Sequence, residues 1–283
     1  ISVNARWIQD GVTVAGGHGE GDATNQLYWP RGLFIDDDQT IVIADYVNNR
    51  IIQWNMDDTN GQVVTGGNGQ GNRLDQFYCP TDLLIEKKRR IVSLYVIAGM
   101  NESSDGLVIV AQHMEKSSST TSLVSDWPWT LRGDNNGTIV AGGNGTGVGL
   151  NQLNGPGYIL VDQQQTVYMS DLYNDRVMKW NKGAREGIVV VGDEGQGNAL
   201  TQLSSPNGLF VDTLGTIFVA DSMNARVMRW PKGAKQGTVI VGGNGEGTEA
   251  NQFYKLRGLS FDRQGNLYVV DRLNNCVQRC SIE

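Results

Sequence analysis

The stretch Gly237-Thr-Val-Ile-Val-Gly-Gly243 repeats two earlier stretches, Gly187-Ile-Val-Val-Val-Gly-Asp193 and Gly137-Thr-Ile-Val-Ala-Gly-Gly143, at intervals of 50 residues. The same opening stands at Gly11 and Gly61, which are also 50 residues apart. A repeat of this length is typical of arrays of small supersecondary units, which bury their apolar faces only by stacking on neighbours. The repeat therefore predicts one body built from stacked copies of a single unit.

One copy of this unit contains the signals of four short β-strands. The opening run is followed by a polar, glycine-rich segment over 242–252, which predicts irregular backbone. Alternating apolar and polar residues over 256–262, a run of strand-forming residues over 267–271 and a last segment over 276–280 predict three further strands separated by turns. Four-stranded antiparallel units at a fixed spacing are the blades of a β-propeller. We therefore predict an all-β propeller.

The two ends of the chain predict how the blades close on one another. The last copy stops at Glu283 after three strands, and the strand that it lacks is present near the other end, at residues 11–14. An N-terminal strand that completes the C-terminal blade would close the ring and leave no long sheet edge exposed.

The repeated motifs resemble the NHL repeat. The pattern Pro-x-Gly-Leu-x-x-Asp, then a strand that ends in Asp, then x-x-Asn-x-Arg-Val/Ile-x-x-Trp, is complete from Pro30 to Trp54 and from Pro206 to Trp230, and its second half is equally clear from Asp171 to Trp180. The match covers most of the chain. The resemblance implies a propeller, usually of six blades, that acts as an interaction module. It also allows the chain to be part of a larger protein, such as the substrate-recruiting module of a ubiquitin ligase.

Two departures from the pattern bear on the blades. In the last copy, Cys276 and Cys280 stand where the other copies have Arg and Trp, so we expect this blade to be the weakest. The spacing from Gly61 to Gly137 is 76 residues, and residues 86–131 match the pattern poorly. We therefore predict a single domain over 1–283 with six blades, one or two of them degenerate within 86–131. Five complete blades with a distorted insert are the alternative.

The recurring Asp-x-x-Asn-x-Arg set combines a carboxylate, an amide and a guanidinium, as an active site could. Because the set recurs in several blades at a strand–turn–strand junction, we interpret it as structural: Asn shapes the turn, and Asp pairs with Arg across the hairpin. Trp54, Trp180 and Trp230 are expected to pack between blades. The glycine-rich segments are not followed by the helix that a phosphate-binding loop requires.

The residue inventory argues against an enzyme. The chain has two histidines, His18 and His113, so it cannot form a three-histidine zinc site, and neither lies in a nucleophile motif. We therefore expect no catalytic residue, no cofactor and no metal site. A calcium-dependent hydrolase or a lyase of propeller form stays open as an alternative, although no copy gathers enough carboxylates at a fixed spacing.

The net charge of the chain and the compartment in which it works bear on which partners it can bind. A net charge of -7 disfavours nucleic acid and anionic membranes, and no apolar run approaches the roughly 18 residues of a spanning helix. We expect a monomer. The compartment stays open between cytoplasm and the outside of the cell: sequons at Asn101, Asn136 and Asn144, if occupied, would favour a secreted ligand-binding propeller.

The residues that differ between copies are the candidate binding residues. They lie in the segments that precede the first strand of each blade, at 28–31, 78–81, 154–157, 204–207 and 254–257. In a propeller these segments lie on one face near the central channel, and aromatic and Arg side chains are enriched where proteins recognise partners. We therefore predict an arc at the channel mouth that binds a protein or peptide, preferably an acidic one. Its members are Tyr28, Trp29, Arg31, Tyr78, Asn207, Tyr254, Lys255 and Arg257.

The alternative is that these side chains have no binding role. The aromatic rings would then pack over the ends of the blades, and the cationic side chains would be solvated.

Overall fold

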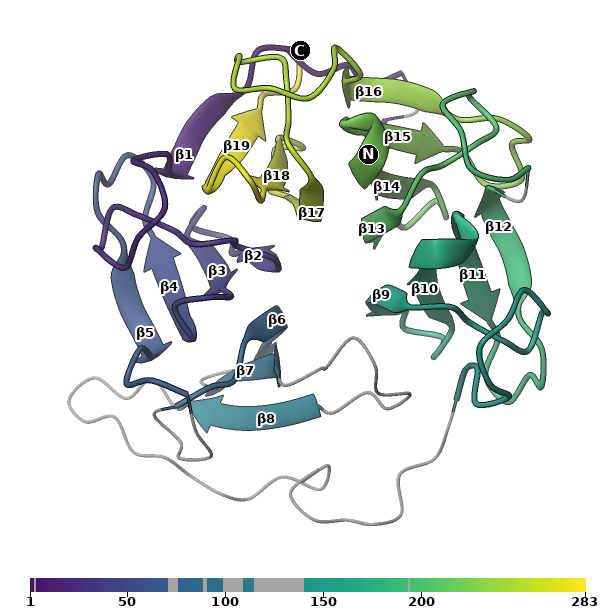
Figure 1. The fold of residues 1–283 in the computed structure, drawn as a ribbon, viewed down its shortest axis with the longest axis horizontal. Helices are drawn as coiled ribbons and strands as arrows, with labels where there is room; N and C mark the ends of the chain where they lie inside the picture. Colours follow the sequence, from purple (N-terminus) through teal and green to yellow (C-terminus); the bar gives the residue numbers. More distant parts are fainter. Residues whose placement is uncertain (3, 71–75, 89–90, 99–108, 115–139, 193) are drawn as a thin grey trace. The chain divides into compact units, whose positions relative to one another are not determined.

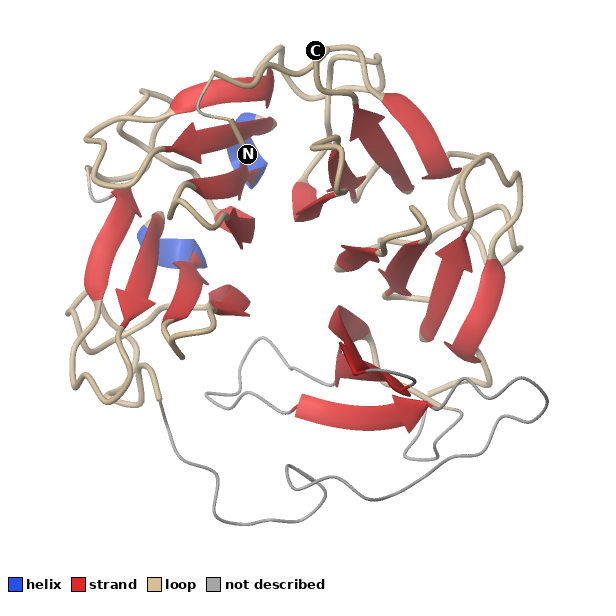
Figure 2. Cartoon of the chain, turned by 180° about the vertical axis from the view of Figure 1, so that it is seen from behind, coloured by secondary structure: helices blue, strands red, loops and turns tan. Residues whose placement is uncertain are grey.

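The computed structural model describes residues 1–2, 4–70, 76–88, 91–98, 109–114, 140–192 and 194–283. These residues form 19 β-strands and two short 3-10 turns, which confirms the all-β class (Figure 2). In this part of the chain, no helix is long and apolar enough to cross a membrane. Contacts divide the chain into two compact units, residues 1–14 with 139–283 and residues 15–138, and each is described by itself.

The first unit contains three four-stranded antiparallel sheets, and each is one blade. Two blades follow the chain order from first to fourth strand. In both, a 3-10 turn, η1 (Leu172–Asn174) or η2 (Ser222–Asn224), joins the second strand to the third. The strands are β9 (Pro156–Val161), β10 (Val167–Asp171), β11 (Arg176–Trp180) and β12 (Ile188–Gly192), then β13 (Pro206–Val211), β14 (Ile217–Asp221), β15 (Arg226–Trp230) and β16 (Thr238–Gly242).

The third blade of this unit joins the two ends of the chain. Its strands are β17 (Leu256–Phe261), β18 (Leu267–Asp271), β19 (Cys276–Cys280) and β1 (Val12–Gly16), in the order β1-β19-β18-β17. The pairing continues before β1, where the N–H of Ile8 donates to the backbone oxygen of Ser281 at 2.9 Å. The prediction that an N-terminal strand completes the C-terminal blade is therefore confirmed.

Within the first unit, the blades pack side by side as in a propeller. The first strands, β9, β13 and β17, are neighbours, and the fourth strands lie farthest from them (Figure 1). The core lies between the blades. One buried cluster combines Phe218 and Val241 of one blade with Leu259, Leu267 and Val269 of the next. Burial of these faces provides the stabilisation that a single four-stranded sheet lacks.

The second unit contains a fourth complete blade and a three-stranded sheet. The first and second strands of the complete blade contact the first strand of the three-stranded sheet. The strands are β2 (Leu33–Ile35), β3 (Ile41–Asp45), β4 (Arg50–Trp54) and β5 (Gln62–Gly66) in the blade, and β6 (Pro80–Lys88), β7 (Ile91–Ala98) and β8 (Ile109–Met114) in the sheet.

The predicted number of six blades is wrong for the described residues, which contain four complete blades and one three-stranded sheet. Strand length explains the error. β6 and β7 have 9 and 8 residues, whereas most strands of the complete blades have five, so one sheet takes up residues that we divided between two degenerate blades. Much of the predicted degenerate region 86–131 lies outside the described residues. The single domain over 1–283 stays a prediction.

A tryptophan at the end of the third strand packs on the glycine that opens the fourth strand. A Cβ added at Gly61, Gly187 or Gly237 would lie 2.7 to 2.8 Å from Trp54, Trp180 or Trp230, respectively. Trp230 also belongs to a buried cluster with Val177 and Leu203 of the preceding blade, so its predicted position between blades is confirmed. The repeated glycine is thus explained by contact with the indole ring.

We predict that Gly237→Ala lowers the free energy of unfolding by about 1 to 3 kcal/mol, because the added methyl group overlaps an indole that is buried on all sides. Urea unfolding measures the change. The matched control is Gly157→Ala, where an added Cβ lies no closer than 3.2 Å to another atom, and there we expect a smaller loss. Equal losses in the two variants would show that the indole contact is not the cause.

Candidate functional site

The carboxylate that ends the second strand of each complete blade is fully buried. In the blade of the second unit, Asp45 Oδ2 accepts from Arg50 Nε at 2.7 Å and from Asn48 Nδ2 at 2.8 Å. Asp45 Oδ1 accepts from the N–H of Tyr28 at 2.8 Å. The same three bonds recur at two further blades, around Asp171 and Asp221. Burial raises the pKa of Asp45 and Asp221, and the bonds from Asn, the backbone and Arg oppose the rise.

The arginine of this cluster connects the hairpin to the glycine-rich loop. Arg226 donates to the backbone oxygens of Asn198 and Ala199 at 2.7 and 3.1 Å, and to that of Gln202 at 3.1 Å. Arg50 and Arg176 make the equivalent bonds. The geometry supports the structural interpretation of Asp-x-x-Asn-x-Arg, because its polar atoms are used to hold three loops of one blade together.

The last blade lacks this arginine, and a neutral amide replaces it. Gln278 Nε2 donates to Asp271 Oδ2 at 2.9 Å and to the backbone oxygen of Gln252 at 3.2 Å. Burial raises the pKa of Asp271 to about 6, against bonds from the N–H of Tyr254 and from Asn274 and Gln278. Burial also raises the pKa of the Cys276 and Cys280 thiols to about 12, so neither is a reactive thiolate near neutral pH.

In the glycine-rich loops of different blades, a side-chain nitrogen bonds two backbone oxygens of its own loop. His18 Nδ1 lies 3.1 Å from the backbone oxygen of Gly16 and 3.2 Å from that of Asn25. Asn144 Nδ2 donates to the equivalent oxygens of Gly142 and Asn151. His18 therefore serves as a loop donor. Of the residues that the structure describes, no three His, Cys, Asp or Glu side chains cluster closely enough to hold a metal ion.

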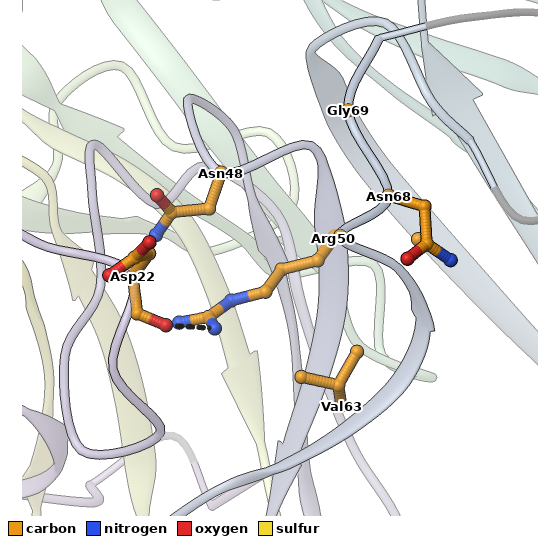
Figure 3. A pocket seen from close by; sticks show the side chains of 8 residues that line it. Asp22, Asn48, Arg50, Val63, Asn68 and Gly69 are labelled. Carbon is orange, nitrogen blue, oxygen red and sulfur yellow. Dashed lines mark hydrogen bonds between the residues drawn. The ribbon is translucent and has the colours of Figure 1, made fainter.

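A pocket of about 460 Å³ lies beside the cluster of the second unit (Figure 3). Arg50, which lines it, donates to Asp45 and to the backbone oxygen of Asp22, and Asn48 donates to Asp45 and to the backbone oxygen of Gly21. The polar groups of this pocket thus belong to the framework of the blade, and we do not assign it a ligand. Its lining residues are Asp22, Asn48, Arg50, Val63, Gly66, Gly67, Asn68 and Gly69.

The segments with the predicted binding residues share an unusual backbone conformation. We call residues 28–31, 78–81, 154–157, 204–207 and 254–257 the entrance loops. In each, the second residue has a positive φ, a conformation that is easiest for glycine. One loop has glycine there, and four do not. The φ values are 52° at Trp29, 49° at Cys79, 63° at Gly155, 50° at Ser205 and 60° at Lys255.

Each entrance loop of a complete blade is bonded to the turn between the second and third strands. The N–H groups of Val47, Tyr173, Met223 and Leu273 donate to the backbone oxygens of Tyr28, Asn154, Ser204 and Tyr254 at 3.0 to 3.2 Å. The two segments therefore form one surface on each blade. We call each entrance loop, together with Tyr46, Tyr173 or Met223 where its blade has one of them, the rim surface of that blade, and we use the same term for these separate surfaces collectively.

In the second unit, the predicted residues Tyr28, Trp29 and Arg31 are half-buried. The rings of Tyr28 and Trp29 meet edge to face, with their centroids 5.7 Å apart. The guanidinium of Arg31 lies 3.8 Å from the centroid of the Tyr46 ring. Tyr78 is 54% exposed. The Tyr28–Trp29 and Arg31–Tyr46 contacts hold these side chains against one another. This agrees in part with the alternative that the rings pack over the ends of the blades.

In the first unit, the predicted residues differ in exposure. Tyr254 is exposed, whereas Asn207 is 4% exposed. The Lys255 ammonium pairs with Glu246 and contacts Met223 Sδ at 3.0 Å. Arg257 lies on β17, next to β13, since a Cβ at Gly208 would be 2.3 Å from the Arg257 backbone oxygen. Tyr28 and Trp29 are in contact, and Asn207 and Arg257 lie on the neighbouring strands β13 and β17. A single arc formed by all eight residues stays a prediction.

Sequence reasoning missed Tyr46, Tyr173 and Met223. They occupy the two variable positions of the Asp-x-x-Asn turn, and Tyr173 and Met223 are exposed. Variation at these positions, next to invariant Asp and Asn within this chain, was the signal that could have identified them.

No protein-family model and no curated protein sequence matches the chain. Solved structures do match it, and the neighbours are propeller proteins. A putative phosphatase from Bacteroides thetaiotaomicron has a TM-score of 0.65 at 11% identity, over 99% of this chain and 79% of that chain. An auxiliary nutrient binding protein from the same species has a TM-score of 0.58 at 10% identity, over 96% and 76%. The calcium-binding protein regucalcin from Agrobacterium tumefaciens has 0.51 at 11%, over 96% of each. At these identities the similarity establishes a propeller fold and leaves the function open.

We predict that Cys276→Arg combined with Gln278→Met restores the cluster of the other blades and lowers the pKa of Asp271. A buried carboxyl with a raised pKa binds its proton more tightly in the folded state. Asp271 therefore contributes a loss of stability as the pH rises from about 4 to about 6, of up to about 3 kcal/mol for two pKa units. The double variant should show a smaller loss over this range and unfold at higher urea concentration at pH 7.

Asp271→Asn is the matched control, because its amide does not titrate and should remove the same part of the pH dependence. Unfolding free energies measured every half pH unit from 4 to 7 test both variants. Wild-type and double-variant curves that stay parallel between pH 4 and 6 would contradict the assignment of this titration to Asp271.

Proposed function

We propose that this chain is a non-catalytic propeller of the NHL type that binds an acidic segment of a protein partner through its rim surface. The observation that carries the proposal is the left-handed backbone at Trp29 and Lys255. A large or long side chain in this conformation costs about 1 kcal/mol or more relative to glycine. Gly155 has the same conformation in an equivalent loop, so the fold accepts glycine there. The presence of these two side chains, rather than glycine, supports a binding use for them.

The charge of the rim surface favours an acidic partner. The chain has a net charge of -7, yet the five entrance loops contain Arg31, Lys255 and Arg257 and no Asp or Glu. Opposite charge at a contact surface directs association and discourages wrong partners. The aromatic rings of Tyr28, Trp29, Tyr78 and Tyr254 supply contact area that loses little side-chain entropy on binding.

Other functions have weaker support. Regucalcin, a fold neighbour, is described as calcium-binding, and another neighbour as a putative phosphatase, so a metal-dependent enzyme is the second candidate. The described carboxylates do not gather into a site for such an ion. A neighbour is a nutrient binding protein, which agrees with a ligand-binding role. If such a propeller were secreted, Asn144 would be an exposed glycan acceptor. We keep a monomer without nucleic-acid or membrane partners as part of the proposal.

We predict that Trp29→Gly and Lys255→Gly each weaken binding of a fluorescein-labelled peptide of ten alternating Glu and Ala residues at least fivefold. Fluorescence anisotropy at low and high salt measures the affinity, which should fall as salt screens the charges. Stability should stay within about 1 kcal/mol of wild type, because glycine relieves the backbone strain that the lost contacts offset.

Ser205→Gly is the matched control, since it relieves the same strain and removes neither a ring nor a cation. We expect it to bind like the wild type. Absence of peptide binding by the wild type, or full affinity in both Trp29→Gly and Lys255→Gly, would refute the proposed function.

A further inference from the structure

A sulfur atom and an ammonium group meet at one contact between blades of the first unit. Met223 lies in η2, and its Sδ is 3.0 Å from Nζ of Lys255 in the entrance loop of the next blade. The other complete blades have Val47, Tyr173 and Leu273 at the position of Met223. Within the complete blades, the thioether at this position therefore occurs once, and it occurs beside a cation.

Met223 is open to solvent, unlike the methionines inside the blades. It is 48% exposed, whereas Met169 is 8% exposed and Met178 and Met228 are fully buried. Met56 lies between these extremes. A small oxidant dissolved in water therefore reaches the sulfur of Met223 more easily than the sulfur of a buried methionine.

The Lys255 ammonium has three N–H donors, and two of them have partners within the chain. One donates to Oε1 of Glu246, and another donates to Sδ of Met223. A carboxylate is a strong acceptor for an ammonium, but a thioether is a weak one. The bond to sulfur is thus the one that a carboxylate of a partner can replace at little cost.

A peroxide converts this weak acceptor into a stronger one. The sulfur attacks one oxygen of hydrogen peroxide, so that a sulfur–oxygen bond forms and the oxygen–oxygen bond breaks. The departing hydroxide takes the proton of the transferred hydroxyl and leaves as water. The sulfur is thereby oxidised by two electrons to a sulfoxide, which is polar and which methionine sulfoxide reductases convert back to the thioether.

We propose that Met223 is an oxidation site whose sulfoxide binds the Lys255 ammonium and thereby weakens binding of the acidic segment. The effect on affinity rests on the proposed function. The sulfoxide oxygen lies one bond from a sulfur that already contacts Nζ, so it competes with the carboxylate of the partner for the same donor. Asp271 holds the N–H of Tyr254, which keeps the backbone of Lys255 beside Met223.

Mass spectrometry after proteolysis tests the oxidation site. The folded chain is treated with hydrogen peroxide for increasing times, and conversion of each methionine to its sulfoxide is measured. Met223 should react about tenfold faster, or more, than Met178 and Met228, because its sulfur is exposed. Equal rates for Met223 and Met178 would overturn the proposal, whether or not any peptide binds.

Nuclear magnetic resonance tests the contact in the absence of a ligand. The Lys255 side chain is followed through the signal of its ε-methylene group, which is identified by its loss in Lys255→Gly. Oxidation should shift this signal in the wild type and should not shift it in Met223→Leu. A signal that stays in place when Met223 is oxidised would overturn the contact between the sulfoxide and the ammonium.

The effect on binding is measured as the affinity for the peptide of alternating Glu and Ala before and after oxidation of the same variant. In the wild type the affinity should fall about threefold to fivefold, since one bond to a charged donor is lost to the sulfoxide. Met223→Leu is the matched control, because it keeps an apolar side chain and cannot form a sulfoxide, and its two affinities should agree. Treatment with methionine sulfoxide reductases should restore the affinity of the wild type.

Two outcomes separate this inference from the proposed function. If the wild type binds the peptide and oxidation lowers the affinity equally in Met223→Leu, or not at all, the inference fails and the proposed function stands. If no peptide binds the wild type, the proposed function and the effect on affinity both fail. The oxidation rates and the Lys255 signal then still decide whether Met223 is oxidised and whether its sulfoxide binds the ammonium.

Discussion

Each complete blade depends on one buried carboxylate. Asp45 and its counterparts accept one bond from the N–H of an entrance loop, one from the Asn of the hairpin and, in three blades, one from an Arg. That Arg also holds the glycine-rich loop through its backbone oxygens. Away from water these bonds are strong, and an unpaired partner would be costly. The carboxylate and its Arg thereby tie together three irregular loops of the blade.

The last blade shows what replaces this interaction where its residues are missing. Gln278 takes over two bonds of the absent Arg, but without a charge, so the pKa of Asp271 rises further than a paired cluster would allow. Cys280, a smaller residue, stands where the other complete blades have a Trp, and it is fully buried. Trp7, from the N-terminal segment, lies in the same buried cluster as Cys280 and donates to the backbone oxygen of Gly265 at 2.8 Å. The segment that adds the fourth strand therefore also adds apolar volume.

The strands and the Asp–Arg pairs were predictable, because each follows from a short sequence pattern that repeats. The pairing of β1 was predictable because the last copy of the repeat lacks its fourth strand. The three-stranded sheet was not, because residues 80–114 lack the pattern and their strands are longer. Positive φ at Trp29 and Lys255 was hidden, since neither residue type signals a left-handed turn.

The buried Asp cluster, which is the same in each complete blade, holds the backbone of the entrance loop, whose side chains vary. The N–H of Tyr254, immediately before Lys255, is held by Asp271, as that of Tyr28, before Trp29, is held by Asp45. A backbone fixed in this way can carry strained residues, because the surrounding bonds determine its path. It also presents their side chains to a partner at a small entropic cost on binding. The same bonds make the loop with Lys255 and Arg257 depend on Asp271, the carboxylate with the weakest set of partners. The loop with Lys255 and Arg257 is therefore held by the carboxylate whose pKa burial raises to about 6.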